Sequence, residues 1–228
     1  PVIRKIQNLT VATKMLIFVA IAHALIVGFY TYFVYQEKKS DLYFAMDERL
    51  TSTAIAMSNH FGALNDKHSA SNPMNQNEYK QQCITISKQM EQMNAAFIYS
   101  MQEDDEGKVH FTMSSESKDD FDKGEGSAFW EVYAEADPKL FEAIKTKKPQ
   151  FAEYTDKWGS FRSIFLPAKT PNGKEYIVGV DIKLDVINAK LQDLLLHSLT
   201  VGLVIFVLSM ILLAFLVKQV TATISGLS

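Results

Sequence analysis

Two long apolar runs constrain this chain more than any other feature. Residues 15–35 and residues 194–217 contain no Asp, Glu, Lys or Arg. An α-helix rises about 1.5 Å per residue and the hydrocarbon core of a bilayer is about 30 Å thick, so a helix of either run can cross it. The alternatives are a buried helix of a soluble core or, for the first run, a signal peptide. A signal peptide has a shorter apolar region, of about 7–15 residues, followed by a small-residue cleavage site.

The charged residues are divided sharply by these runs. All 26 acidic residues lie between them, whereas Arg4, Lys5, Lys14 and Lys218 lie outside. Basic flanks mark the cytoplasmic side of a membrane span. We therefore expect, in order, a cytoplasmic leader (1–14), a membrane helix (15–35), a periplasmic domain (36–193), a second membrane helix (194–217) and a cytoplasmic tail (218–228). The net negative charge of the external domain argues against nucleic acid or anionic lipid as its partner.

Catalytic and metal-binding motifs are missing from the sequence. There is no G-x-S-x-G, H-E-x-x-H or P-loop pattern, and the histidines do not have the spacing of metal ligands. The single cysteine, Cys83, excludes an internal disulfide, although a domain of this size can build a core in an oxidising periplasm. We expect no enzyme activity, no metal and no cofactor.

One ionisable residue, His23, lies inside the first apolar run. Ionisable groups within a membrane are functional candidates by default. A neutral imidazole packed against the partner helix is the simpler interpretation, and we favour it.

Between the runs, the sequence pattern predicts an α+β domain. Residues 37–66 have apolar side chains at heptad-like spacing, which predicts a long helix that continues the first membrane helix. Its apolar stripe should pack on a sheet or on a second copy of the helix. A second helix (78–93), a hairpin (96–101 and 109–113) and an irregular acidic loop (114–127) follow.

The last part of the domain contains a helix and three strands. Asp137 and the proline after it predict a helix start, and this helix should end near Lys147. Strands are expected at 151–154, 161–168 and 176–181, separated by the turn sequences DKWG and PNG. The predicted fold is therefore a five-stranded antiparallel sheet with helices, flanked by two membrane helices.

This order resembles the extracytoplasmic PAS-like sensor domains called Cache domains. The matching pieces are AAFIYSMQEDDEGKVHF, DPKLFEAI, YTDKWGSF and FLPAKTPNGKEYIVGVDI, which fall within residues 95–191. The leader NLTVATKMLI is similar to the start of bacterial methyl-accepting chemotaxis proteins, and the tail KQVTATISGLS is placed like the start of a HAMP signalling helix.

The resemblance implies a homodimeric receptor of the cell inner membrane. It would bind a small molecule outside the cell and signal through the second membrane helix to cytoplasmic partners. No Gly or Pro lies between Val180 and Val201, so the connection is stiff enough to transmit a displacement. The alternatives are a histidine kinase or diguanylate cyclase with the same sensor, or a membrane-anchored module that binds a periplasmic protein.

In such domains the ligand lies between the sheet and a lid. The candidate ligand-binding residues are Tyr99, Phe111, Trp130, Tyr133, Tyr154, Trp158, Arg162 and Asp181. Arg162 suits a carboxylate ligand, or else a salt bridge with a domain acid such as Asp156. Asp181 suits a ligand amine, or else a cap of the following helix. Each aromatic residue has packing in the core or in the lid as its alternative role. Because Arg162 suits a carboxylate and Asp181 suits an amine, we expect the ligand to be a carboxylate or an amino compound.

Overall fold

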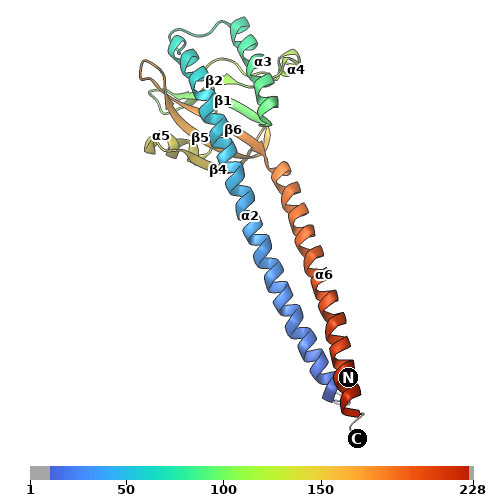
Figure 1. Ribbon diagram of the computed structural model, residues 1–228. Helices are drawn as coiled ribbons and strands as arrows, with labels where there is room; N and C mark the ends of the chain where they lie inside the picture. The colour runs from blue at the N-terminus through green and yellow to red at the C-terminus, as the bar shows by residue number, and fades with distance from the viewer. Residues whose placement is uncertain (1–10, 226–228) are drawn as a thin grey trace. The chain divides into compact units, whose positions relative to one another are not determined.

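The computed structural model describes residues 11–225 (Figure 1). Its elements are, in order, α2 (Val11–Lys67), α3 (Gln76–Met93), β1 (Phe97–Glu103), β2 (Val109–Ser114), α4 (Lys118–Lys123), β3 (Glu131–Val132), α5 (Pro138–Thr146), β4 (Gln150–Asp156), β5 (Gly159–Lys169), β6 (Glu175–Lys183) and α6 (Leu184–Ser225). The predicted leader (1–14) and tail (218–228) lie partly outside the described residues.

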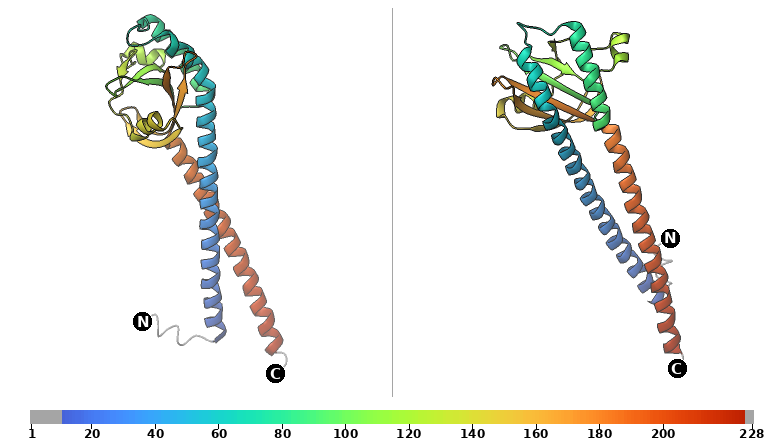
Figure 2. Two further views of the ribbon diagram at one scale, coloured as in Figure 1. Left: turned by 90° about the vertical axis from the view of Figure 1, so that its left-hand side faces the viewer. Right: turned by 45° about the horizontal axis from the view of Figure 1, so that its top comes forward.

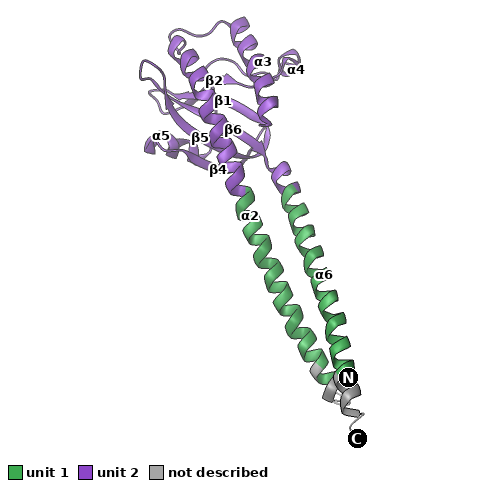
Figure 3. Ribbon diagram, viewed as in Figure 1, with its two compact units in different colours: residues 1–42, 190–228 green, residues 43–189 purple. Residues whose placement is uncertain are grey.

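The chain forms two compact units, coloured separately in Figure 3. One unit contains residues 1–42 and 190–228, and the other contains Tyr43–Ala189. Helices α2 and α6 each continue through a unit boundary without a break. The two units are therefore joined by helix and not by loops.

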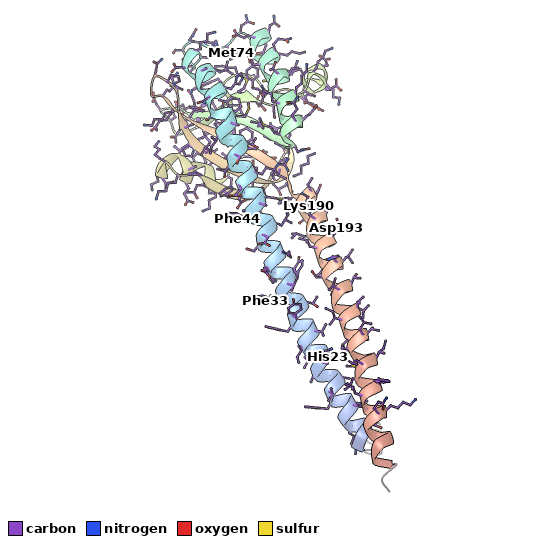
Figure 4. The ribbon with its side chains drawn as sticks, viewed as in Figure 1. His23, Phe33, Phe44, Met74, Lys190 and Asp193 are labelled. Atoms are coloured by element: carbon purple, nitrogen blue, oxygen red, sulfur yellow. The ribbon has the colours of Figure 1, made fainter. Side chains whose placement is uncertain are left out.

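The first unit contains the N-terminal part of α2 and most of α6. Both helices are long and apolar enough to cross a membrane. His23, labelled in Figure 4, places its Nε2 2.5 Å from Ser209 Oγ and stacks its ring on Phe206. The Ser209 hydroxyl donates to the Ile205 carbonyl, so it accepts from the Nε2–H of His23. The predicted packing of His23 against the partner helix is confirmed.

The second unit contains one antiparallel sheet, with strand order β3-β2-β1-β6-β5-β4. The predicted hairpin (β1, β2) and meander (β4, β5, β6) are confirmed, and β1 pairs with β6 to join them. The prediction of five strands is wrong by one, because β3 is a two-residue edge strand, too short for alternation to reveal. Gly179 lies opposite Tyr99 in the β1–β6 register, where a Cβ atom would overlap the Tyr99 ring.

The acidic segment 114–127 is not the irregular loop that we predicted, because it contains helix α4. The Ser117 hydroxyl accepts from the Asp120 backbone N–H, and the Asp120 carboxylate accepts from the Ser117 N–H. This reciprocal pair is a capping box, and its S-x-x-D pattern is visible in the sequence. Helix α5 begins as predicted, with Asp137 as its N-cap and Pro138 as its first residue.

Helices α2 and α3 cover one face of the sheet (Figures 1 and 2). Four residues of the predicted apolar stripe of α2 are buried, Met46, Leu50, Ala54 and Met57, and Phe61, outside that stripe, is buried with them. Buried amides also connect α2 to β1: Gln102 donates to Asn65 over 2.9 Å, and Asn65 donates to Ser100 Oγ over 3.2 Å. Partnered buried polar groups of this kind favour one register of helix on sheet.

Helix α5 packs against β4 and β5 on the opposite face (Figure 2). The core on this face consists of Tyr99, Met101, Val109, Phe111, Tyr133, Leu140, Ala143, Ala152, Phe165 and Ile177. Five of the candidate ligand-binding aromatic residues belong to this core or pack against it. The candidate site must therefore be an extension of this core.

Candidate ligand-binding site

A β-bulge in β2 determines which side chains face the site. Ser100 pairs with Met113, but the next residue of β1, Met101, pairs with Phe111. Thr112 is therefore the extra residue, and its hydroxyl lies 2.7 Å from Ser100 Oγ on the helix-covered face. A bulge shifts the alternation of side chains by one position. As a result, Phe111 and Ser114 both line the same cavity.

The cavity has a volume of about 670 Å³. Its walls come from β1, β2, β4, β5 and β6, from the segment around α4, and from the β4–β5 turn. The lining residues are Phe97, Tyr99, Phe111, Ser114, Glu116, Asp120, Gly124, Glu125, Gly126, Ser127, Glu131, Tyr133, Tyr154, Asp156, Lys157, Trp158, Phe161 and Asp181. This size and this mixture of aromatic and polar groups suit a small organic ligand.

Asp181 of β6 is the buried carboxyl group of the cavity. It is 3% exposed, and its Oδ1 accepts from the Tyr99 hydroxyl over 2.9 Å and from the Tyr154 hydroxyl over 3.4 Å. Burial raises the pKa of Asp181 to about 7, against the opposing effect of the hydrogen bonds that it accepts. A buried carboxyl group whose charge is so costly favours a partner that neutralises it.

Aromatic rings surround the space beside this carboxyl group. The ring of Trp158 lies 6.0 Å from those of Phe111 and Tyr133, edge-on to the first. The Tyr133 hydroxyl donates to Asp156 over 2.9 Å, which holds the segment after β3 against the end of β4. Such π-faces attract cations, and the Lys157 ammonium already lies 4.2 Å from the Trp158 ring.

The charges of the lining are strongly unbalanced. Its carboxyl groups are Glu116, Asp120, Glu125, Glu131, Asp156 and Asp181, whereas its basic residue is the exposed Lys157. Glu116 is itself buried and accepts from the Ser127 backbone N–H over 2.8 Å, and burial raises the pKa of Glu116. The cavity is therefore electrostatically suited to a cation and poorly suited to an anion.

Six of the predicted site residues come together in this cavity: Tyr99, Phe111, Tyr133, Tyr154, Trp158 and Asp181. Asp181 does not end its strand, because β6 continues to Lys183, and its carboxylate bonds to tyrosines and not to the first turn of α6. Arg162 and Trp130 lie elsewhere.

Arg162 lies on the helix-covered face of β5. Alternation places its neighbour Phe161 in the cavity, so Arg162 points away from it. Its Nε and one terminal nitrogen donate to the two oxygens of Asp47 over 2.7 and 2.6 Å, and its other nitrogen donates to Glu153 over 3.0 Å. The ion-pair interpretation was therefore right in kind, but the partners are Asp47 and Glu153 and not Asp156.

Trp130 stacks on His110, with ring centroids 4.9 Å apart and planes 15° apart. Its backbone N–H donates to Phe111 O just before β3 begins. Trp130 is therefore a neighbour of the cavity wall and not part of the lining.

Sequence reasoning missed several lining residues. Phe97 and Phe161 lie at strand ends and their rings contact each other edge-on at 5.5 Å, which no local pattern reveals. Glu116 lies in the polar segment SSES, a sequence context that predicts an exposed side chain. Its burial in the folded chain distinguishes it from the exposed acidic residues nearby. Asp156 was noted as an ion-pair partner but not as a lining residue.

Comparisons with known proteins identify similar structures but no family. No family model matches the sequence, and no curated protein matches it. The chain is similar to the sensory domain of the Campylobacter jejuni chemoreceptor Tlp3 (CcmL) with isoleucine bound, at 15% sequence identity and a TM-score of 0.44, covering 81% of this chain and 65% of that one. It is also similar to the ligand-binding domain of Tlp3 in complex with L-valine, at 17% identity and a TM-score of 0.42, covering 81% and 66%. Both are domains of a chemoreceptor, the class that the sequence resembles, and this chain spans less than two thirds of each.

Proposed function

We propose that this chain is the sensory and membrane-spanning part of a transmembrane chemoreceptor with a single Cache-type domain. The ligand is a small molecule that carries an amino or other cationic group and binds in the cavity at Asp181. The observation that carries this proposal is the buried Asp181 carboxyl group, held by Tyr99 and Tyr154 at an aromatic cavity wall.

The lining favours an amine over a carboxylate ligand. A bound carboxylate would need a cation, and Lys157 is the basic residue that the described lining offers. Arg162, the cation suggested by the sequence, is already engaged by Asp47. An ammonium group, in contrast, would neutralise Asp181 and lie against aromatic faces.

The two apolar helices support the membrane topology. Residues 15–35 and 194–217 would form the spans, residues 36–193 the periplasmic domain, and the basic ends the cytoplasmic side of the inner membrane. In this proposal the receptor is of the chemotaxis type, and a histidine kinase or a diguanylate cyclase with the same sensor is the alternative.

The connection from β6 to α6 supports signalling through the second span. Strand β6 ends at Lys183 and α6 begins at Leu184, so Asp181 lies three residues before the helix. Ile187, in the first turns of α6, is fully buried. A ligand that moves the end of β6 would therefore move the start of α6 with it, and the stiff helix would carry the displacement onward.

Association of two copies through α2 is part of the proposal. Phe44 and Ile55 are 66% and 55% exposed and lie eleven positions apart, about three helical turns, so they share one face of α2. A second copy is the partner that the resemblance implies. Cysteine substitution of Ile55 should give disulfide-linked dimers in membranes, whereas cysteine at the exposed Glu142 of α5 should not. Equal cross-linking at both positions would contradict an α2 interface.

A ligand screen on the full chain in lipid nanodiscs tests the site. Both tryptophans, Trp130 and Trp158, lie in the unit 43–189, so their fluorescence during heating reports that unit. Amines should raise the melting temperature, and simple carboxylic acids should not. The Asp181→Asn variant should lose the shift, whereas Asp105→Asn, an exposed acid in the β1–β2 turn, should keep it. Stabilisation by acids, or by amines equally in Asp181→Asn, would refute the proposal. Co-purification of a periplasmic protein without any ligand response would favour the protein-binding alternative.

A further inference from the structure

His110 lies between two hydrogen-bond acceptors. It is on β2 and its side chain is 8% exposed. Its Nε2 is 2.7 Å from Asp104 Oδ2 in the β1–β2 turn, and its Nδ1 is 3.0 Å from the backbone carbonyl oxygen of Trp130. A neutral imidazole carries one N–H and can donate to only one of these atoms, whereas an imidazolium donates to both.

Asp104 is arranged as an ionised acceptor. Its Oδ1 accepts from the backbone N–H groups of Glu106 and Lys108 over 2.9 and 2.8 Å, which leaves Oδ2 for His110. The hydrogen bond from His110 is the main cause that lowers the pKa of Asp104. A carboxylate with this environment does not supply the missing proton, so both contacts are hydrogen bonds only when both ring nitrogens of His110 carry hydrogen.

The backbone of Trp130 is in a conformation that its surroundings must stabilise. Trp130 has φ of 67°, in the left-handed region that non-glycine residues rarely adopt unless their surroundings impose it. Its indole lies parallel to the His110 ring at 4.9 Å, an arrangement that a cationic ring strengthens. Both the carbonyl contact and the stacking therefore favour the same charge on His110.

The held segment continues directly into the cavity wall. Strand β3 starts at Glu131 and pairs with β2 through only two positions, His110 with Val132 and Phe111 with Glu131. Glu131 lines the cavity, and so does Tyr133, whose N–H donates to Val109 O. The contact between His110 and the Trp130 carbonyl is therefore one of the few hydrogen bonds that tie this segment to β2.

Several other titratable groups lie near His110. The turn contributes Asp104, Glu106 and Lys108, β1 contributes Glu103, and β3 contributes Glu131, which lies 4.0 Å from Lys157. Just after α2, the ring of His68 contacts Phe129, which in turn contacts Trp130. His68 also lies 3.8 Å from Glu78 of α3. His68 is therefore the neighbour that a test must separate from His110.

We propose that His110 is a proton-controlled latch on the cavity wall. When the ring is charged, it ties the Trp130 carbonyl to Asp104 and holds residues 130–133 in place. When the ring is neutral, one of the two hydrogen bonds is lost and this segment loosens. The consequence for ligand binding rests on the proposed function, but the latch itself is tested without any ligand, so the two can fail separately.

The experiment uses the full chain in nanodiscs with Trp158→Phe, which leaves Trp130 as the sole tryptophan. A charged imidazole quenches indole emission more strongly than a neutral one. The emission of Trp130 should therefore increase as the pH is raised, in one transition between about pH 5 and 8, the range in which histidine loses its charge. His68→Gln should keep this transition and His110→Gln should remove it. Hydrogen exchange of residues 128–133, corrected for its intrinsic pH dependence, should increase roughly fivefold across the transition, the effect of one lost hydrogen bond.

The Asp104→Asn variant gives a test that a merely structural role would not pass. Its amide oxygen keeps the two turn N–H groups, while its NH₂ donates to Nε2 of a neutral His110 whose Nδ1–H still reaches Trp130. The neutral ring is then the latched form, so exchange of 128–133 should increase as the pH falls. A wild-type transition that persists in His110→Gln, or exchange that does not respond to pH, would overturn the latch. So would an Asp104→Asn variant with the same sign as the wild type.

Discussion

Replacing Asp181 by Asn should make the domain more stable at alkaline pH. Asp181 is buried, and burial raises its pKa from 3.8 to about 7. The folded state therefore holds a proton that the unfolded state has already released between about pH 4 and 7. By linkage, the free energy of unfolding falls as the pH rises through this window. At about 1.4 kcal/mol per pH unit, the loss reaches roughly 4 kcal/mol above pH 7, as an upper bound.

The isosteric amide removes this titration and keeps an oxygen for the Tyr99 hydroxyl. Urea unfolding of the full chain, followed by tryptophan emission at pH 5, 6, 7 and 8, gives the difference between wild type and Asp181→Asn. Taking the difference cancels other titrating groups such as Asp104, whose lowered pKa acts in the opposite direction. Among these pH values the difference should be smallest at pH 5, and it should grow in favour of the variant toward pH 8.

The same reasoning predicts the pH dependence of ligand binding. An amine that binds the ionised carboxylate displaces its proton, so affinity should rise with pH up to about 7 and then level off. Calorimetry in buffers of different ionisation enthalpy should detect about one released proton near pH 6. A stability difference that does not change with pH, or that favours the wild type at pH 8, would show that Asp181 is not the costly buried charge described above.

Three further substitutions test the packing around the site, each by urea unfolding or by ligand titration of the full chain. Arg162→Ala should lower the free energy of unfolding by about 2 kcal/mol because it leaves Asp47 without its ion-pair partner. The control Lys169→Ala, at an exposed position, should lower it by less than about 0.5 kcal/mol. Equal effects would mean that the ion pair does not stabilise the fold. Gly179→Ala should cost about 1–3 kcal/mol because its methyl group displaces the Tyr99 ring, and a neutral result would mean that the ring moves freely. Tyr154→Phe should weaken amine binding about two- to tenfold with little change in stability; unchanged affinity would remove Tyr154 from the site.

Features with a local cause were predictable from the sequence. The turn sequences DKWG and PNG place two hairpin bends, and glycines with positive φ occupy both, Gly159 and Gly173. Asp137 caps α5 as its position before a proline indicates. The S-x-x-D pattern at Ser117 had the same kind of local cause, and missing it turned α4 into a predicted loop. In each case, the residues that specify the element lie within one turn of one another.

Other features depend on segments that are distant in the sequence. The bulge at Thr112 exists only because β1 pairs with β2, and it reverses the alternation that assigns Phe111 and Ser114 to a face. Arg162 bonds to Asp47 of α2, which lies 115 positions away in the sequence. Alternation within a strand says that neighbours face opposite sides, but not which side the helices will cover.

The sequence by itself determined two apolar helices, an acidic domain between them and the types of residue available for a binding site. Only the tertiary structure decided that Asp181, Tyr99 and Tyr154 meet in one cavity while Arg162 is turned away. The physical reason is that the free-energy cost of a carboxylate charge is greatest where water is excluded, and this cost sets both the pKa of the group and its preference for a cationic partner. Burial of that kind is a property of several packed segments together and not of any one of them.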